Sequence, residues 1–133
     1  MNRIVAAVVA GIVCLIIVSA FSGKNGWQAP REAESRKNPL ANDPKAAKAG
    51  AVLYKQYCEI CHGSKGKGDG TAESGLQTPL NSLASETTQK NADGTVFWKI
   101  STGHAQMPAY KSLLTDQQIW QLVNFVKTLG KKI

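Results

Sequence analysis

Two cysteines and a histidine stand in the run Cys58-Glu59-Ile60-Cys61-His62, and their side chains are the strongest candidates for chemistry in this chain. Thiols three positions apart beside an imidazole suit a redox-active dithiol, a zinc site, or the covalent attachment of a haem. In haem attachment each thiol adds to one vinyl group of the porphyrin, and two intervening residues match the distance between the vinyls. The next side chain then lies under the iron, where an imidazole nitrogen becomes an axial ligand. We therefore predict that Cys58 and Cys61 hold a haem and that His62 binds its iron.

The competing kinds of site fit the rest of the sequence less well. A redox-active Cys-x-x-Cys belongs to a βαβ context, and no stretch of this chain alternates like a strand. A zinc site needs four ligands, which Cys58, Cys61, His62 and His104 could supply, but no second pair stands at finger spacing. A plain disulfide between Cys58 and Cys61 is sterically poor at a helix end.

The second axial ligand must come from another part of the chain, and the candidates are Met107, His104 and Met1. Met107 lies in a polar turn directly before Pro108, where an apolar side chain is unusual as core filler. A thioether there would complete His/Met ligation, which raises the reduction potential above that of a bis-imidazole site. We predict Met107 as this ligand.

Helices must position these residues, and the first begins with an N-cap aspartate, Asp43, followed by Pro44 at the first helical position. Small and apolar residues then recur at spacings of three and four up to Cys58. A short helix is predicted over residues 94–102, capped by Asp93 and ended by Gly103. Its apolar face consists of Val96, Phe97 and Ile100, and the face of the first helix consists of Ala47, Gly50, Ala51, Tyr54 and Cys58.

The last helix has the clearest pattern. Thr115 and Gln118 form a capping box, and Gly130 is predicted to end the helix. Its apolar stripe is Ile119, Leu122, Val123, Val126 and Leu129. The domain is therefore predicted to be all-α, with three main helices and loops so long that a large prosthetic group must hold them together.

These motifs, in this order, resemble a class I cytochrome c domain of the bacterial monohaem kind over residues 43–133. The resemblance is carried by Gly50-x-x-x-Tyr54, Cys58-Glu-Ile-Cys-His62-Gly63, Gly66-Lys-Gly68-Asp-Gly70, Thr78-Pro79-Leu80, Phe97-Trp98-Lys99-Ile100, Met107-Pro108-Ala109-Tyr110 and Trp120-Gln-Leu122-Val-Asn-Phe125-Val126-x-x-Leu129. It implies one covalently bound haem c, and a one-electron carrier rather than an enzyme.

The same resemblance assigns further roles. Gly50 and Tyr54 should cross the last helix near Leu122 and Phe125, with glycine permitting a close approach. Pro79 matches the family's proline whose carbonyl accepts a hydrogen bond from the haem histidine, which would fix the tautomer of His62. A peroxidase or ligand sensor remains an alternative, and it would require Met107 to leave the iron.

An apolar run over residues 4–21 precedes the domain, and about 1.5 Å of rise per residue makes it roughly long enough to span a bilayer as a helix. A cleaved export signal is the competing interpretation, since Arg3 precedes the run and Val18-Ser19-Ala20 near its end has small residues at the cut. We predict a retained single-pass anchor over residues 1–21, a flexible tether over 22–42 and the cytochrome c domain over 43–133. The haem domain would then lie on the periplasmic side of a bacterial cytoplasmic membrane.

The chain of 133 residues carries a net charge of +7. The charge is dispersed and the body is predicted to be exported, which argues against nucleic-acid binding. Lysines near the haem would favour acidic membrane-bound donors and acceptors, or simply keep the surface solvated. The candidates are Lys65, Lys67, Lys99, Lys111 and Lys127. The chain is thus predicted to serve a respiratory or photosynthetic electron-transfer chain, as a mobile carrier or as a fixed haem subunit of a larger membrane oxidoreductase complex.

Overall fold

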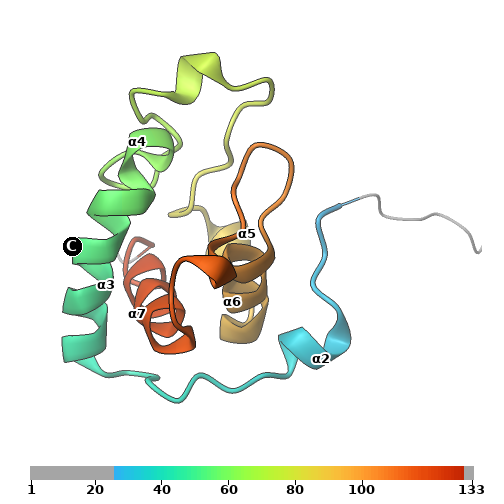
Figure 1. Cartoon of the computed structure of the whole chain (residues 1–133), viewed down its shortest axis with the longest axis vertical. Coiled ribbons are helices and arrows are strands. Elements are labelled where there is room, and N and C mark those ends of the chain that lie inside the picture. The colour runs from blue at the N-terminus through green and yellow to red at the C-terminus, as the bar shows by residue number, and fades with distance from the viewer. Residues whose placement is uncertain (1–25, 131–133) are drawn as a thin grey trace, which may run out of the picture.

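The computed structural model describes residues 26–130, and all regular structure in that part of the chain is helical (Figure 1). The predicted all-α class is therefore confirmed for the described part. No helix within residues 26–130 combines the length and apolar character needed to cross a membrane. The predicted anchor, residues 1–21, lies outside the described residues. The α-helices are α2 (Arg31–Glu34), α3 (Pro44–Tyr57), α4 (Glu59–His62), α5 (Glu86–Gln89), α6 (Asp93–Thr102) and α7 (Asp116–Val126), with 3-10 turns η1 (Glu73–Gly75) and η2 (Tyr110–Ser112).

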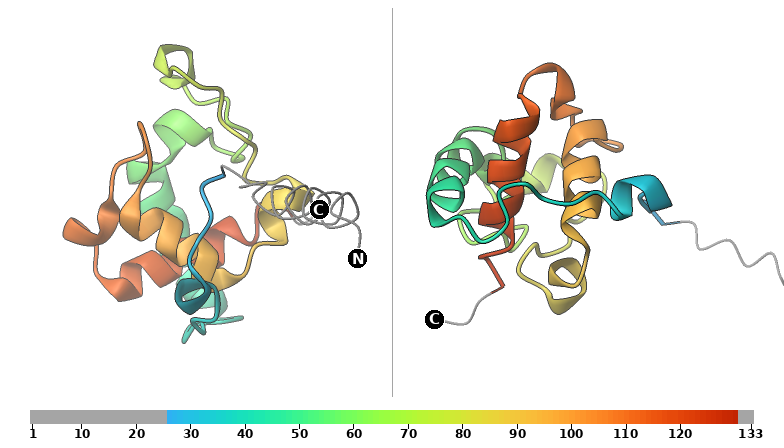
Figure 2. Two further views of the ribbon diagram at one scale, coloured as in Figure 1. Left: turned by 90° about the vertical axis from the view of Figure 1, so that its right-hand side faces the viewer. Right: turned by 90° about the horizontal axis from the view of Figure 1, so that it is seen from below.

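The crossing of α3 and α7 is the centre of the fold, and Figures 1 and 2 show the two helices packed side by side. Gly50 lies at the contact, where an added Cβ would overlap the backbone carbonyl of Gln121. One turn later, Tyr54 packs on Phe125 with ring centroids 4.9 Å apart. The predicted crossing of Gly50 and Tyr54 with the last helix is thus confirmed, and glycine is required for its closeness.

The predicted helix ends agree with the structure at α3 and at the start of α7. The Asp43 carboxylate accepts a hydrogen bond from the Lys45 N–H, and Thr115 and Gln118 form the reciprocal capping box. The α-helix of α7 ends at Val126, one turn before the predicted stop at Gly130. Four of the five predicted stripe residues are buried, namely Ile119, Leu122, Val123 and Val126, and Leu129 is partly buried.

Helix α6 begins at Asp93 and ends before Gly103, whose φ is +63°. Asp93 is its first residue rather than its N-cap, and its side chain makes no capping bond. The carboxylate instead accepts a hydrogen bond from Asn38 and lies 3.8 Å from the Lys127 ammonium. The prediction that Asp93 caps this helix was therefore wrong, because tertiary partners occupy its side chain.

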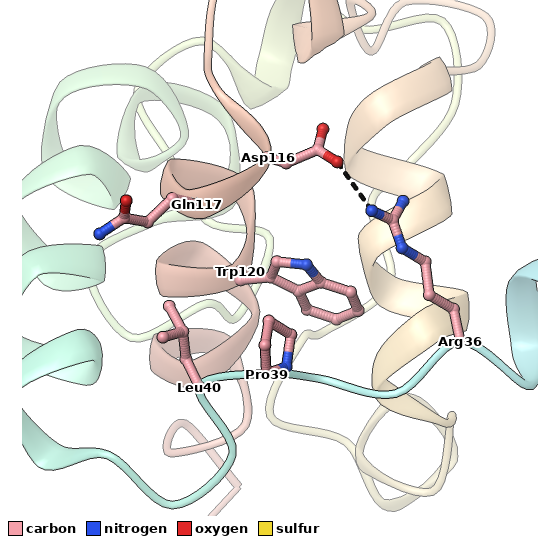
Figure 3. Close-up of a pocket in the computed structure, with 6 residues that line it drawn as sticks. All are labelled: Arg36, Pro39, Leu40, Asp116, Gln117 and Trp120. Atoms are coloured by element: carbon pink, nitrogen blue, oxygen red, sulfur yellow. Dashed lines mark hydrogen bonds and ion pairs between the residues drawn. The ribbon is translucent and has the colours of Figure 1, made fainter.

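Residues 27–42, which we call the N-terminal strap, pack along α6 and α7, whereas the sequence predicted a flexible tether over residues 22–42. Arg36 pairs with Asp116 at 2.7 Å (Figure 3). Its guanidinium also lies over the Phe97 ring, 4.1 Å from the ring centroid. Asn38 donates hydrogen bonds to Asp93 and Asn124. Scattered polar contacts with distant residues hold this segment, and such contacts leave no periodic pattern in the sequence.

Candidate functional site

Cys58, Cys61 and His62 lie where α3 ends and α4 begins. Cys58 is the C-cap of α3, and α4 follows at once with Glu59–His62. Both thiols are free and partly buried. Cys58 also packs against the hydrophobic core that α3, α6 and α7 share. The helix crossing therefore fixes the position of the whole attachment run.

The glycine-rich loop after His62 folds back on α4 and ties it in place. The amides of Gly68, Gly70 and Ala72 donate to the carbonyls of His62, Cys61 and Ile60 at 2.8, 3.1 and 2.9 Å. Gly63, Gly66 and Gly68 all have positive φ, which allows this sharp reversal. These glycines therefore allow the loop to return directly beside the attachment run.

His62 is partly buried, and its Nδ1 is a buried atom with no hydrogen-bond partner. Burial lowers the pKa of His62, which favours the neutral imidazole that binds metals. The carbonyl of Pro79, predicted by the resemblance to accept from this ring, does not do so here, and Pro79 is exposed. An imidazole with an unpartnered nitrogen, in the same five-residue run as two free thiols, fits the attachment of a haem through Cys58, Cys61 and His62.

The competing chemistries fit these residues poorly. Burial, and secondarily the charge of Cys61, raises the pKa of Cys58 to about 12, whereas a redox-active dithiol needs a depressed thiol pKa. Within residues 26–130, no three His, Cys, Asp or Glu side chains lie close enough together to bind a metal ion. His104 is exposed and stacks on Trp27, so it does not complete a zinc site.

Met107 closes a tight turn after α6. The amide and carbonyl of His104 bond to the carbonyl and amide of Met107, at 3.0 and 2.9 Å. The Met107 side chain is partly buried and packs against the same core that Cys58 borders. The fold thus places Met107 and the attachment run around one hydrophobic core, whereas Met1 lies outside the described residues.

Two of the five lysines that were predicted to lie near the haem contact other residues of the domain. Lys127 donates to the carbonyls of Gln89 and Asn91 at 2.6 and 2.7 Å, and Lys99 lies 5.1 Å from the centre of the Trp27 ring. Burial also lowers the pKa of Lys99. Lys65, Lys67 and Lys111 are exposed.

The sequence reasoning did not identify what holds the end of α3 against the turns around it. The Tyr110 hydroxyl donates to the Tyr57 carbonyl at 2.8 Å, and the Tyr54 hydroxyl donates to the Gly63 carbonyl at 2.7 Å. Both carbonyls lie immediately beside the attachment run. Buried tyrosines next to a cysteine pair were the available signal, because a buried phenol needs a partner.

Comparison with known proteins shows what this chain is similar to. Residues 45–126 match the protein family described as cytochrome c oxidase, cbb3-type, subunit III. A solved chain of the reducing HAO-like protein complex of Kuenenia stuttgartiensis is similar, with 27% identity and a TM-score of 0.63. The match covers 70% of this chain and 47% of that one, so the present chain matches about half of its length.

Proposed function

The chain belongs to the cytochrome c family of cbb3-type oxidase subunit III, and on that premise we propose that it is a one-electron carrier with a single haem c. Membership of the family implies covalent haem and electron transfer. The observation that best supports the proposal is the partly buried His62 ring, whose buried Nδ1 has no partner, in the same five-residue run as two free thiols.

In this proposal Cys58 and Cys61 would attach the porphyrin, and His62 and Met107 would be the two protein ligands of the iron. The bound haem supplies the ferric/ferrous couple. The chain contributes a rigid frame, because the α3–α7 crossing fixes His62 and the turn closed by His104 fixes Met107. Two protein ligands leave no open position for a substrate, which favours electron transfer over catalysis.

A redox titration of the haem-loaded protein tests this function. We expect one reversible one-electron transition, a methionine-to-iron charge-transfer band in the oxidised form, and carbon monoxide binding by the reduced form that is far slower than in Met107→Ala, because Met107 must first leave the iron. Met107→Ala should lose the band and bind carbon monoxide. His104→Phe is the matched control, since phenylalanine cannot bind iron but keeps a ring against Trp27. Wild-type protein that binds carbon monoxide as readily as Met107→Ala would refute His/Met ligation.

We further propose that residues 1–21 are a retained anchor in a bacterial cytoplasmic membrane and that the haem domain lies on the periplasmic side. The uninterrupted apolar run over residues 4–21 supports this. Salt and carbonate washes of membranes from the native host should leave the protein in the pellet. Release of a shortened chain that begins near Ala20 would indicate a cleaved signal instead.

Exposed Lys65, Lys67 and Lys111 support acidic electron-transfer partners. The rate of reduction by an acidic partner should fall as ionic strength rises, and replacement of these three lysines by glutamine should flatten that dependence. A rate that ignores salt would contradict the proposal.

A fixed haem subunit of a larger oxidoreductase is the second candidate. It is favoured by the packing of the N-terminal strap, which leaves less free chain between anchor and domain than a tether over residues 22–42 would. The similar Kuenenia chain also comes from a complex. Stoichiometric partners that co-purify after detergent extraction would support this candidate, and a monodisperse single chain would favour the mobile carrier.

A further inference from the structure

We propose that Trp27 is a positioning residue for Met107. Its ring stacks on His104 and so holds the turn of residues 104–107 against the end of α6. This inference rests on the proposed His/Met ligation and extends it. Trp27 lies outside the region that matches the family, which begins at residue 45.

The N-terminal strap that carries Trp27 is anchored firmly enough to hold a distant side chain. At Gly94, the first turn of α6 lies against the strap so closely that an added Cβ would overlap the Ala33 carbonyl. Further along, Asn38 donates to Asn124 at 2.7 Å, and Asn124 donates to the Leu40 carbonyl. These contacts fix the course of the strap along α6 and α7 (Figure 2).

At the other end of the strap, Trp27 meets three side chains from the end of α6 and the turn after it. Its ring stacks on His104 with centroids 5.2 Å apart and planes inclined by 18°. Its centroid lies 6.3 Å from that of Trp98, and the Lys99 ammonium lies 5.1 Å from its centre. A tryptophan so surrounded is a fixed support for the His104 ring.

The turn that begins at His104 needs such support. It is closed by the two backbone bonds between His104 and Met107, and Ala105 within it has a positive φ of 49°. Residues 104–106 are exposed, so the hydrophobic core does not hold them. Outside contacts exist on two sides: the Gln77 amide donates to the Gln106 side chain at 2.7 Å, and the Trp27 ring stacks on His104.

Loss of the stack should therefore let the turn open more often and draw Met107 away from the iron. One aromatic pair corresponds to a roughly three- to tenfold change in such an opening equilibrium. Carbon monoxide can bind the reduced iron only while Met107 is displaced, so its binding rate reports the opening directly.

The experiment compares haem-loaded full-length wild type, Trp27→Ala, Trp27→Phe and Ala46→Gly. We expect carbon monoxide to bind Trp27→Ala roughly three to ten times faster than wild type, with a weaker methionine-to-iron band, and Trp27→Phe to restore both. Ala46→Gly destabilises the buried start of α3, far along the helix from Cys58, by about 1 kcal/mol. It should leave both readouts unchanged, because general destabilisation does not act on the turn.

Two results would overturn the inference: Trp27→Ala with the wild-type rate, or Ala46→Gly with the same acceleration as Trp27→Ala. A wild-type protein with no methionine band and free carbon monoxide binding would instead overturn the proposed ligation, and the inference with it. The wild-type measurement therefore separates the two failures.

Discussion

Replacement of Gly50 by alanine tests the helix crossing that supports the whole site. The added methyl would overlap the backbone carbonyl of Gln121 and come within 3.0 Å of the Phe125 Cβ. Because backbone atoms cannot rotate away, α3 and α7 must separate, at an overpacking cost of about 3 kcal/mol. The higher helix propensity of alanine offsets about 1 kcal/mol. The net loss of unfolding free energy should be about 2 kcal/mol, or roughly thirtyfold in the folding equilibrium constant.

Guanidinium unfolding of the haem-loaded protein, followed by far-UV circular dichroism, measures this loss. Gly75→Ala is the matched control, since a Cβ at Gly75 meets nothing within 4 Å. We expect Gly75→Ala to stay within about 0.5 kcal/mol of wild type. A Gly50→Ala protein as stable as wild type would refute the close crossing, and so would a gain of the size that propensity alone predicts.

Three further predictions concern side chains that form hydrogen bonds within the domain. Lys127→Met should cost about 1–2 kcal/mol of unfolding free energy, because it leaves the Gln89 and Asn91 carbonyls without their donor, whereas the exposed Lys90→Met should change it by no more than about 0.5 kcal/mol; similar losses in the two variants would contradict this. Asn124→Ala should speed proteolysis within the N-terminal strap, since it removes the bonds to Asn38 and Leu40; an unchanged cleavage pattern would count against the docked strap. Burial raises the pKa of Tyr110 to about 12. The contribution of its hydroxyl to the unfolding free energy is therefore full below pH 10 and is lost between pH 10 and 12. The difference in unfolding free energy between wild type and Tyr110→Phe should shrink only in that window. A difference that stays constant up to pH 12 would contradict the raised pKa.

Local patterns in the sequence predicted much of the fold because the forces involved are local. The Asp43 cap and the Thr115–Gln118 capping box involve neighbours within one turn, and both are confirmed. The Gly50 crossing was predicted by resemblance, which carries long-range information that spacing alone lacks. The attachment run was also recognisable, because its chemistry depends on residues three and four positions apart.

The failures share a different physical origin. The docking of the strap depends on the hydrogen bond between Asn38 and Asn124. Lys127 is not free to meet a partner protein because it donates to the carbonyls of Gln89 and Asn91. These are contacts between residues far apart in the sequence, made by single polar side chains. No periodicity marks them, so the sequence predicted a flexible tether and placed Lys127 among the lysines near the haem, whereas the strap and Lys127 both make contacts within the fold. The Pro79 carbonyl accepts no hydrogen bond from His62 Nδ1 in the structure, so its role rests on the resemblance alone.

Covalent attachment of a haem to Cys58 and Cys61 is the claim on which the account depends, and one measurement on the exported protein tests it. Intact mass, together with thiol titration of the denatured chain, reports the bound group and the state of both sulfurs. We predict a coloured protein whose mass exceeds that of the polypeptide by one haem and in which neither Cys58 nor Cys61 reacts with a thiol reagent. A colourless protein of polypeptide mass, with both thiols reactive, would contradict it.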